Sequence, residues 1–201
     1  MSKVGIIDYG MGNLHSVKGA LDYIGIGNFI SNDKTELAKA DALILPGVGA
    51  FPDAMECLNR LELTDFIRSE TLKKPLLGIC LGMQLLFDKS YEFRECDGLG
   101  LIHGEVIKLT KARKIPHMGW NSLKFLRDSK LCGNLPEQPY VYFVHSFKGE
   151  AADRSDILAV TDYDEEVCAI VASGNVYGTQ FHPEKSESVG LTILRNFGGM
   201  F

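Results

Sequence analysis

Cys80 stands between two glycines in the sequence Gly78-Ile79-Cys80-Leu81-Gly82. A buried strand that enters such a stretch and continues as a helix places the middle residue on a sharp turn, where both flanking residues must be small. The turn puts the sulfur at the start of the helix, where the dipole and free backbone N–H groups favour thiolate, and the N–H of Leu81 faces a developing oxyanion. The pattern predicts a nucleophile; a buried structural cysteine is the alternative.

A histidine and a carboxylate suited to this cysteine lie about a hundred residues further on. His182 follows an apolar run, and Pro183 ends the predicted strand there. Glu184 is placed to accept the second imidazole N–H and to fix the ring and its tautomer. Together with Cys80 these residues predict a Cys-His-Glu triad, whereas His-Pro-Glu alone would be read as a surface turn.

Two further glycines, Gly47 and Gly49, follow another apolar run. They lie at the carboxyl edge of the predicted sheet, as Cys80 does, and ligands of open α/β sheets bind at that edge. Glycine lets backbone N–H groups approach a substrate closely, so this segment is a candidate for the second oxyanion donor. The alternative is a plain turn into a helix; no Gly-Lys-Ser/Thr follows, which excludes a phosphate loop.

The elements that must position these residues alternate in type along the first half of the chain. Short apolar runs predict strands at residues 4–8, 28–31, 41–45 and 75–79. Helical spacing predicts helices at residues 13–24, 35–39, 51–58, 63–72 and 82–87. Such alternation implies a parallel sheet that is covered on both faces.

The second half reads mainly as strands, with a hairpin signal at Ser173-Gly174-Asn175. Strands are predicted at residues 101–109, 121–125, 140–144, 157–161, 167–172 and 176–181, and a last helix at 186–197. We therefore expect one α/β domain over residues 1–201. Its mostly parallel central sheet would carry helices on both faces and additional antiparallel strands from the C-terminal half.

Composition narrows the class of protein. The formal charge of −5 argues against a nucleic-acid partner. No apolar stretch follows Met1 as in a signal peptide, and none reaches the roughly 20 residues of a membrane span, so the cytoplasm is expected. The chain has five cysteines, an odd number, and no two of them have the CxxC spacing. A disulfide framework and a structural zinc site are therefore not expected. We expect no metal and no cofactor.

The segments 78–84 and 180–184 resemble the class I (triad) glutamine amidotransferases. Segments 7–14, 46–51, 116–121, 142–147 and 182–186 look, within that family, like the glutaminase subunits of imidazole glycerol phosphate synthases. The resemblance covers nearly the whole chain and implies the flavodoxin-like fold of that class. It implies that Cys80 attacks the glutamine side-chain amide, that His182, held by Glu184, protonates the leaving ammonia, and that water hydrolyses the γ-glutamyl thioester.

The same resemblance assigns further residues. It implies an oxyanion hole from the backbone of Val48 or Gly49 and of Leu81. Glutamine would be held by Gly47, Gln84, His145, Ser146 and Phe147. The resemblance implies that His145 positions the substrate through its local backbone and that His117 is not catalytic. Without the resemblance, the sequence favours a structural role for both histidines. Lys148 and Glu187 depart from the family's usual aromatic residue and glutamine at these positions.

The implied partner is a (β/α)8 cyclase subunit, in a heterodimer, that receives ammonia through its barrel. There phosphoribulosyl-formimino-AICAR phosphate (PRFAR) would become imidazole glycerol phosphate and AICAR, a step of L-histidine biosynthesis. The docking face would include Asn13, Met118, Trp120 and Lys185. The alternatives are that Asn13 is a helix cap, that Met118 and Trp120 are core side chains, and that Lys185 is a solvated surface charge.

Three other functions compete with this one. A stand-alone cysteine hydrolase would be fully active without a partner. A paralogous subunit would deliver ammonia to another synthase, such as one that modifies a sugar. A non-catalytic binding subunit would need neither Cys80, His182 nor Glu184.

Overall fold

The computed structural model describes residues 3–201. Met1 and Ser2, the first residues of the stretch in which no signal peptide is expected, lie outside this range. The central sheet runs, from edge to edge, through β2 (Gly27–Ser31), β1 (Lys3–Ile7), β3 (Ala42–Gly47), β4 (Leu76–Cys80), β14 (Val176–Thr179), β13 (Glu166–Ser173), β12 (Ile157–Asp162) and β9 (Lys124–Phe125). Strands β2, β1, β3, β4 and β14 are mutually parallel, and the last three are added antiparallel.

This arrangement confirms the predicted α/β fold. The order β2-β1-β3-β4-β14 is that of flavodoxin-like sheets. The predicted hairpin joins β13 to β14, and Gly174 in its loop has a φ of 56°, which suits glycine. Strands β3 and β4 are buried along their whole length, as expected for parallel strands covered on both faces.

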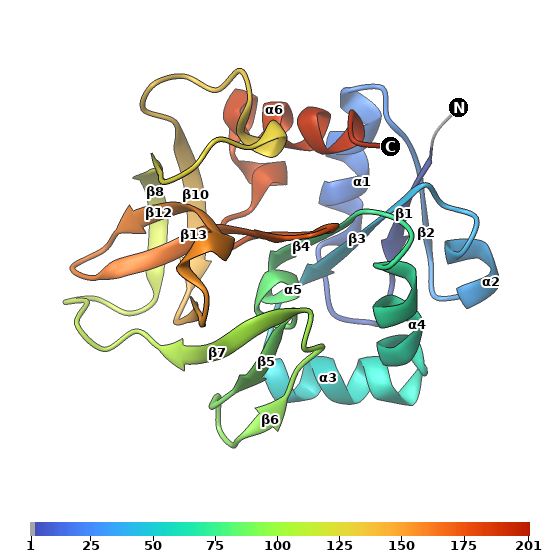
Figure 1. Cartoon of the computed structure of the whole chain (residues 1–201), viewed down its shortest axis with the longest axis horizontal. Coiled ribbons are helices and arrows are strands. Elements are labelled where there is room, and N and C mark those ends of the chain that lie inside the picture. The colour runs from blue at the N-terminus through green and yellow to red at the C-terminus, as the bar shows by residue number, and fades with distance from the viewer. Residues whose placement is uncertain (1–2) are drawn as a thin grey trace.

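Helices cover the two faces of the central sheet. Figure 1 shows α1 (Leu14–Tyr23) and α6 (Glu187–Gly198) on one side and α3 (Phe51–Arg60) and α4 (Leu63–Glu70) on the other. The short α2 (Lys34–Leu37) follows β2. Each face has its own apolar core, and the strands contribute side chains to both cores. Short 3-10 helices lie at η1 (Lys130–Cys132), η2 (Arg154–Asp156) and η3 (Pro183–Lys185).

Two smaller sheets lie beside the central one. One has the order β11 (Phe147–Ala151), β7 (Ile102–Lys108), β5 (Phe87–Ser90) and β6 (Cys96–Asp97). The other pairs β8 (His117–Ser122) with β10 (Tyr140–His145). Strands β5, β6 and β11 were not predicted, and the single strand expected at 121–125 is divided between β8 and β9.

The helix predicted at 82–87 is wrong beyond its first turn. Helix α5 (Leu81–Gln84) ends there, and the chain continues into β5. The carbonyl of Leu85 accepts the N–H of Leu99 at 2.8 Å, and that of Leu86 accepts the N–H of Leu101 at 2.8 Å. These long-range bonds replace the helical ones, so tertiary pairing overrides the local pattern.

Candidate active site

The three motifs singled out in the sequence meet at the carboxyl edge of the central sheet. Gly47 at the end of β3 pairs with Cys80 at the end of β4, and Thr179 of β14 pairs with Ile79. His182 comes three residues after the end of β14. The parallel arrangement of β3, β4 and β14 therefore brings distant parts of the chain together.

Cys80 lies on the sharp turn between β4 and α5. Its φ of 56° and ψ of −111° are unusual for a residue with a side chain and are typical of a nucleophile held on an elbow. A Cβ atom on Gly82 would overlap the carbonyl oxygen of Leu45, and one on Gly78 would lie 2.6 Å from the carbonyl oxygen of Gly82. Both flanking residues must therefore be glycine for the turn to close.

The His182 ring is held by a buried carboxylate. Its Nδ1 lies 2.8 Å from Oε1 of Glu184, and the two side chains are 2% and 1% exposed. The His182 N–H donates to the carbonyl of Tyr142 at 3.0 Å, and its carbonyl accepts the Ser186 hydroxyl at 2.6 Å. Backbone and side chain of His182 are thus fixed independently.

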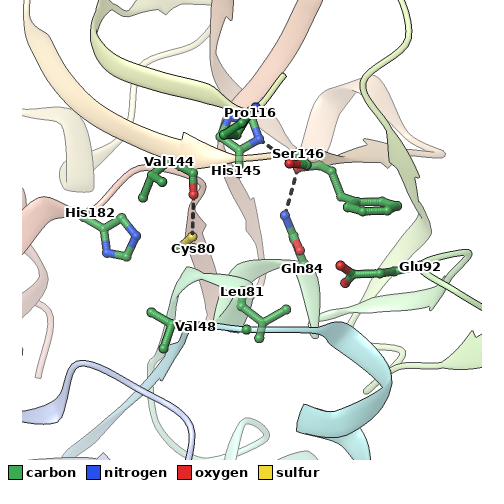
Figure 2. A pocket seen from close by; sticks show the side chains of 12 residues that line it. Val48, Cys80, Leu81, Gln84, Glu92, Pro116, Val144, His145, Ser146 and His182 are labelled. Carbon is green, nitrogen blue, oxygen red and sulfur yellow. Dashed lines mark hydrogen bonds between the residues drawn. The ribbon is translucent and has the colours of Figure 1, made fainter. Parts of the chain in front are cut away.

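The second ring nitrogen of His182, Nε2, lies on the side of the ring that is next to Cys80 (Figure 2). Nε2 is buried and has no hydrogen-bond partner in the described chain, and Figure 2 shows the ring beside Cys80. Burial opposes protonation of the ring, but the adjacent Cys80 and Glu184 side chains raise the pKa of His182 above its ordinary value. The arrangement favours an imidazolium next to the sulfur, as general acid chemistry at a thiolate requires.

A cavity of about 390 Å³ opens beside Cys80. Among the sequence-predicted residues, those that line it are Val48, Gly49, Cys80, Leu81, Gln84, His145, Ser146, Phe147 and His182. Two predicted residues lie behind this lining. Gly47 packs so closely on the elbow that an added Cβ would lie 2.8 Å from the Gly82 nitrogen, and Glu184 stands behind His182.

The loop after β3 has the backbone that its glycines predict. Gly49 has a φ of 103°, a region that glycine occupies freely, and an added Cβ would lie 2.7 Å from Cε of Met11. Val48, Gly49 and Leu81 all line the cavity next to Cys80. Their role as oxyanion donors stays a prediction that this placement supports.

Two glutamine side chains connect the cavity wall to the sulfur. Gln84, 5% exposed, donates from Nε2 to the carbonyl of Phe147 at 2.9 Å and to Oε1 of Gln180 at 3.1 Å. Nε2 of Gln180 lies 3.9 Å from Sγ of Cys80. The sulfur also lies 3.8 Å from the carbonyl oxygen of Val144 (Figure 2).

Three residues that were not predicted as site residues also line the cavity, namely Glu92, Pro116 and Val144. Glu92 is the one carboxylate in this lining; it accepts the N–H of Phe51 at 2.8 Å, and burial raises its pKa. It faces the cavity opposite His182 in Figure 2. No local pattern marks Glu92, because it lies in the loop between β5 and β6, neither of which was predicted.

The predicted docking residues are at the surface. Met118 and Trp120 are 59% and 48% exposed on β8, which contradicts the alternative that they are core residues. Asn13 stands at the N-cap position of α1, as predicted, but its side chain makes no capping hydrogen bond. Lys185 is exposed in η3.

Within residues 3–201, no group of three or more His, Cys, Asp or Glu side chains is placed to hold a metal ion. None of the helices described there is long and apolar enough to cross a membrane.

A flavodoxin-like sheet with a cysteine elbow, a histidine and a buried glutamate defines a class of thiol-dependent hydrolases and transferases. The model of the family "Glutamine amidotransferase class-I" matches residues 5–199. "Imidazole glycerol phosphate synthase subunit HisH" of Bacillus cereus (strain G9842) is 50% identical, with 98% of this chain and 94% of the relative covered. The proteins of the same name from Geobacillus thermodenitrificans (strain NG80-2) and Shouchella clausii (strain KSM-K16) are 50% and 52% identical and are each covered over 97% of their length, with 100% and 97% of this chain covered.

Solved structures give the same fold. "Crystal structure of glutamine amidotransferase" has a TM-score of 0.76 at 22% identity, covering 97% of this chain and 98% of that one. "Structure of PurLQS from Thermotoga maritima" has a TM-score of 0.77 at 21% identity, covering 98% and 97%. This chain belongs to the class I glutamine amidotransferases and, within them, to the family of the HisH subunits.

Proposed function

We propose that this chain is the glutaminase subunit of an imidazole glycerol phosphate synthase and hydrolyses L-glutamine to glutamate and ammonia. One observation carries the proposal. Cys80 on its elbow and His182, bound to Glu184 at 2.8 Å, flank one cavity whose remaining wall holds Gln84. The family relationship over nearly the whole chain agrees with it.

The residues define a two-stage reaction. The Cys80 thiolate attacks the amide carbon of glutamine, and backbone N–H groups of Leu81 and of Val48 or Gly49 stabilise the oxyanion. The intermediate collapses as His182 gives its proton to the amine, so ammonia leaves and a γ-glutamyl thioester remains. His182 then takes a proton from water, the hydroxide attacks the thioester, and glutamate leaves as the thiolate is restored.

The cavity also has groups for the amino-acid end of the substrate. The Glu92 carboxylate, partly buried at the cavity wall, suits the ammonium group of glutamine. The departures from the family pattern lie elsewhere. Lys148 pairs with Glu165 at 2.9 Å and with Glu150 at 3.1 Å, outside the cavity lining, and Glu187 begins α6.

The partner in this proposal is a (β/α)8 cyclase subunit, joined in a heterodimer. It would receive the ammonia and convert PRFAR to imidazole glycerol phosphate and AICAR in L-histidine biosynthesis. The exposed Met118 and Trp120, with Lys185 and Asn13, form the proposed docking face. The five cysteines are all free thiols, which suits the reducing cytoplasm as the location.

Glutamate release by the purified chain, alone and with its matched cyclase and PRFAR, tests the proposal. We expect weak activity from the chain alone and a sharp rise in the complex. Cys80→Ala should abolish hydrolysis in both states. Unchanged hydrolysis by Cys80→Ala would remove this cysteine from the mechanism, and full activity without the cyclase would favour the stand-alone hydrolase.

A genetic measurement separates the ammonia acceptors. The chain and its matched cyclase are expressed in a histidine auxotroph that lacks both subunits, at low ammonium. We expect growth without histidine, and loss of growth with Cys80→Ala. Failure of the wild-type pair to restore growth would contradict the histidine assignment and favour a paralogue that serves another synthase.

A further inference from the structure

A line of hydrogen-bonded side chains outside the triad crosses from β8 to β10. Nδ2 of Asn121 lies 3.3 Å from Nε2 of His117. Nδ1 of His117 lies 3.0 Å from Nε2 of His145. Nδ1 of His145 lies 2.8 Å from the carbonyl oxygen of Phe147, which lines the cavity beside Cys80.

Backbone groups at both ends fix where the protons lie. The Asp162 carbonyl can only accept from Asn121 Nδ2, at 2.8 Å, and the Ser122 N–H can only donate to Asn121 Oδ1, at 2.8 Å. Asn121 therefore presents N–H to Nε2 of His117, which must accept.

The Phe147 end of the line leads to the same proton positions. The Phe147 carbonyl can only accept, so His145 carries its proton on Nδ1 and accepts at Nε2. His117 must then donate from Nδ1. Both rings are therefore neutral, with the proton on Nδ1.

Burial supports the neutral state of both rings. His117 and His145 are 2% and 6% exposed. Burial lowers the pKa of His117 to about 4 and that of His145 to about 3. Aromatic neighbours hold the His117 ring in plane, since it stacks on Tyr163 at 3.9 Å and on Phe143 at 4.5 Å between ring centres.

The line continues from Phe147 to the nucleophile. The same Phe147 carbonyl accepts Nε2 of Gln84, and Gln84 donates to Oε1 of Gln180. With Oε1 accepting, the amide of Gln180 turns its Nε2 toward Sγ of Cys80, 3.9 Å away. An N–H so placed stabilises a thiolate.

We propose that His117 and His145 are positioning residues of the glutaminase. Held as neutral Nδ1–H rings, they fix the Phe147 carbonyl and, through Gln84, the amide of Gln180 beside Cys80. They touch neither the substrate amide nor the sulfur, and they transfer no proton in the reaction. This inference rests on the proposed function for its kinetic consequence, whereas its structural claim is measurable without activity.

Nitrogen NMR of the 15N-histidine-labelled complex tests the structural claim. We expect His117 and His145, assigned by their loss in single variants, to be neutral at pH 7 with the proton on Nδ1. A free neutral histidine side chain mostly carries its proton on Nε2, so the expected pattern is distinctive. A charged ring, or a proton on Nε2 of either ring, would overturn the inference.

Kinetics of the complex test the positioning role. His145→Leu removes the donor to Phe147, and we expect kcat per titrated active site to fall about tenfold, the factor that corresponds to about 1.4 kcal/mol. His145→Asn keeps an N–H near the Nδ1 position and should recover most of this loss. His117→Leu combined with His145→Leu should be no slower than His145→Leu alone, because both act through one carbonyl.

His103→Asn replaces a histidine whose side chain is 83% exposed and should leave kcat unchanged. Unchanged kcat per active site in His145→Leu would overturn the positioning role. If His145→Leu does not fold, the tautomers measured by NMR in the wild-type complex decide whether the inference holds. A wild-type complex that does not hydrolyse glutamine contradicts the proposed function, whereas an active complex with Nε2–H rings contradicts only this inference.

Discussion

At the scale of single residues, the proposed chemistry depends on how His182 is held. Glu184 binds Nδ1 at 2.8 Å, and the free Nε2 is buried on the side of Cys80. The spacing His-x-Glu made this pair predictable from the sequence, because residues two apart at a strand end are adjacent in space. Glu92 was not predictable in this way, since its place on the cavity wall is set by distant strand pairing.

The His182–Glu184 pair makes stability depend on pH. The neighbours raise the pKa of His182, so their stabilisation is complete below the ordinary value of about 6.5 and is lost as pH rises through the folded-state pKa. Glu184→Gln should lower the free energy of unfolding by about 2 kcal/mol at pH 6 and by less at higher pH. Denaturant unfolding across pH measures the difference.

A matched control for this prediction is Glu56→Gln, at an exposed position of α3. It should change stability little at any pH. A deficit of Glu184→Gln that grows with rising pH would contradict the account of how His182 is charged.

At the scale of elements, the elbow between β4 and α5 is the critical joint. Its two glycines and central cysteine are a local signal, so the turn could be read from the sequence. The length of α5 could not. Hydrogen bonds from Leu99 and Leu101 stop the helix after Gln84, and these depend on residues that are distant in the sequence. Strands β5, β6 and β11 were not predictable for the same reason, because their pairing also depends on residues that are distant in the sequence.

The elbow predicts a contrast between two glycine substitutions. Gly82→Ala places a Cβ on the Leu45 carbonyl and should lower the free energy of unfolding by about 3 kcal/mol. Gly19→Ala lies in α1 with no neighbour within 4 Å of the added atom and should raise it by up to about 1 kcal/mol. Equal effects of the two substitutions in denaturant unfolding would contradict the close contact described for Gly82.

At the scale of the whole molecule, one sheet connects both cores and carries the site at its edge. We propose on this basis that residues 1–201 form a single domain. The alternation of strands and helices made the sheet predictable. The exposure of Met118 and Trp120 followed only from the family resemblance and not from the local pattern, because apolar residues on a strand are usually buried.

The exposed Met118 and Trp120 side chains of β8 predict the contact with the cyclase. Trp120→Ala should weaken binding by about 2 kcal/mol or more, as for a central aromatic residue of an interface. Calorimetric titration with the matched cyclase measures this loss. Leu72→Ala, at a position that is 83% exposed outside the proposed docking face, is the control and should bind as the wild type does. Equal affinities of the two variants would contradict the docking face.

The most direct measurement of the central claim is covalent labelling with a glutamine analogue that carries an electrophilic carbon at the amide position. Peptide mass spectrometry of the labelled complex should find one modified residue, Cys80, with the other four cysteines unlabelled. His182→Asn should slow the labelling strongly. Modification of a different cysteine, or none at Cys80, would contradict the assignment of this sulfur as the nucleophile.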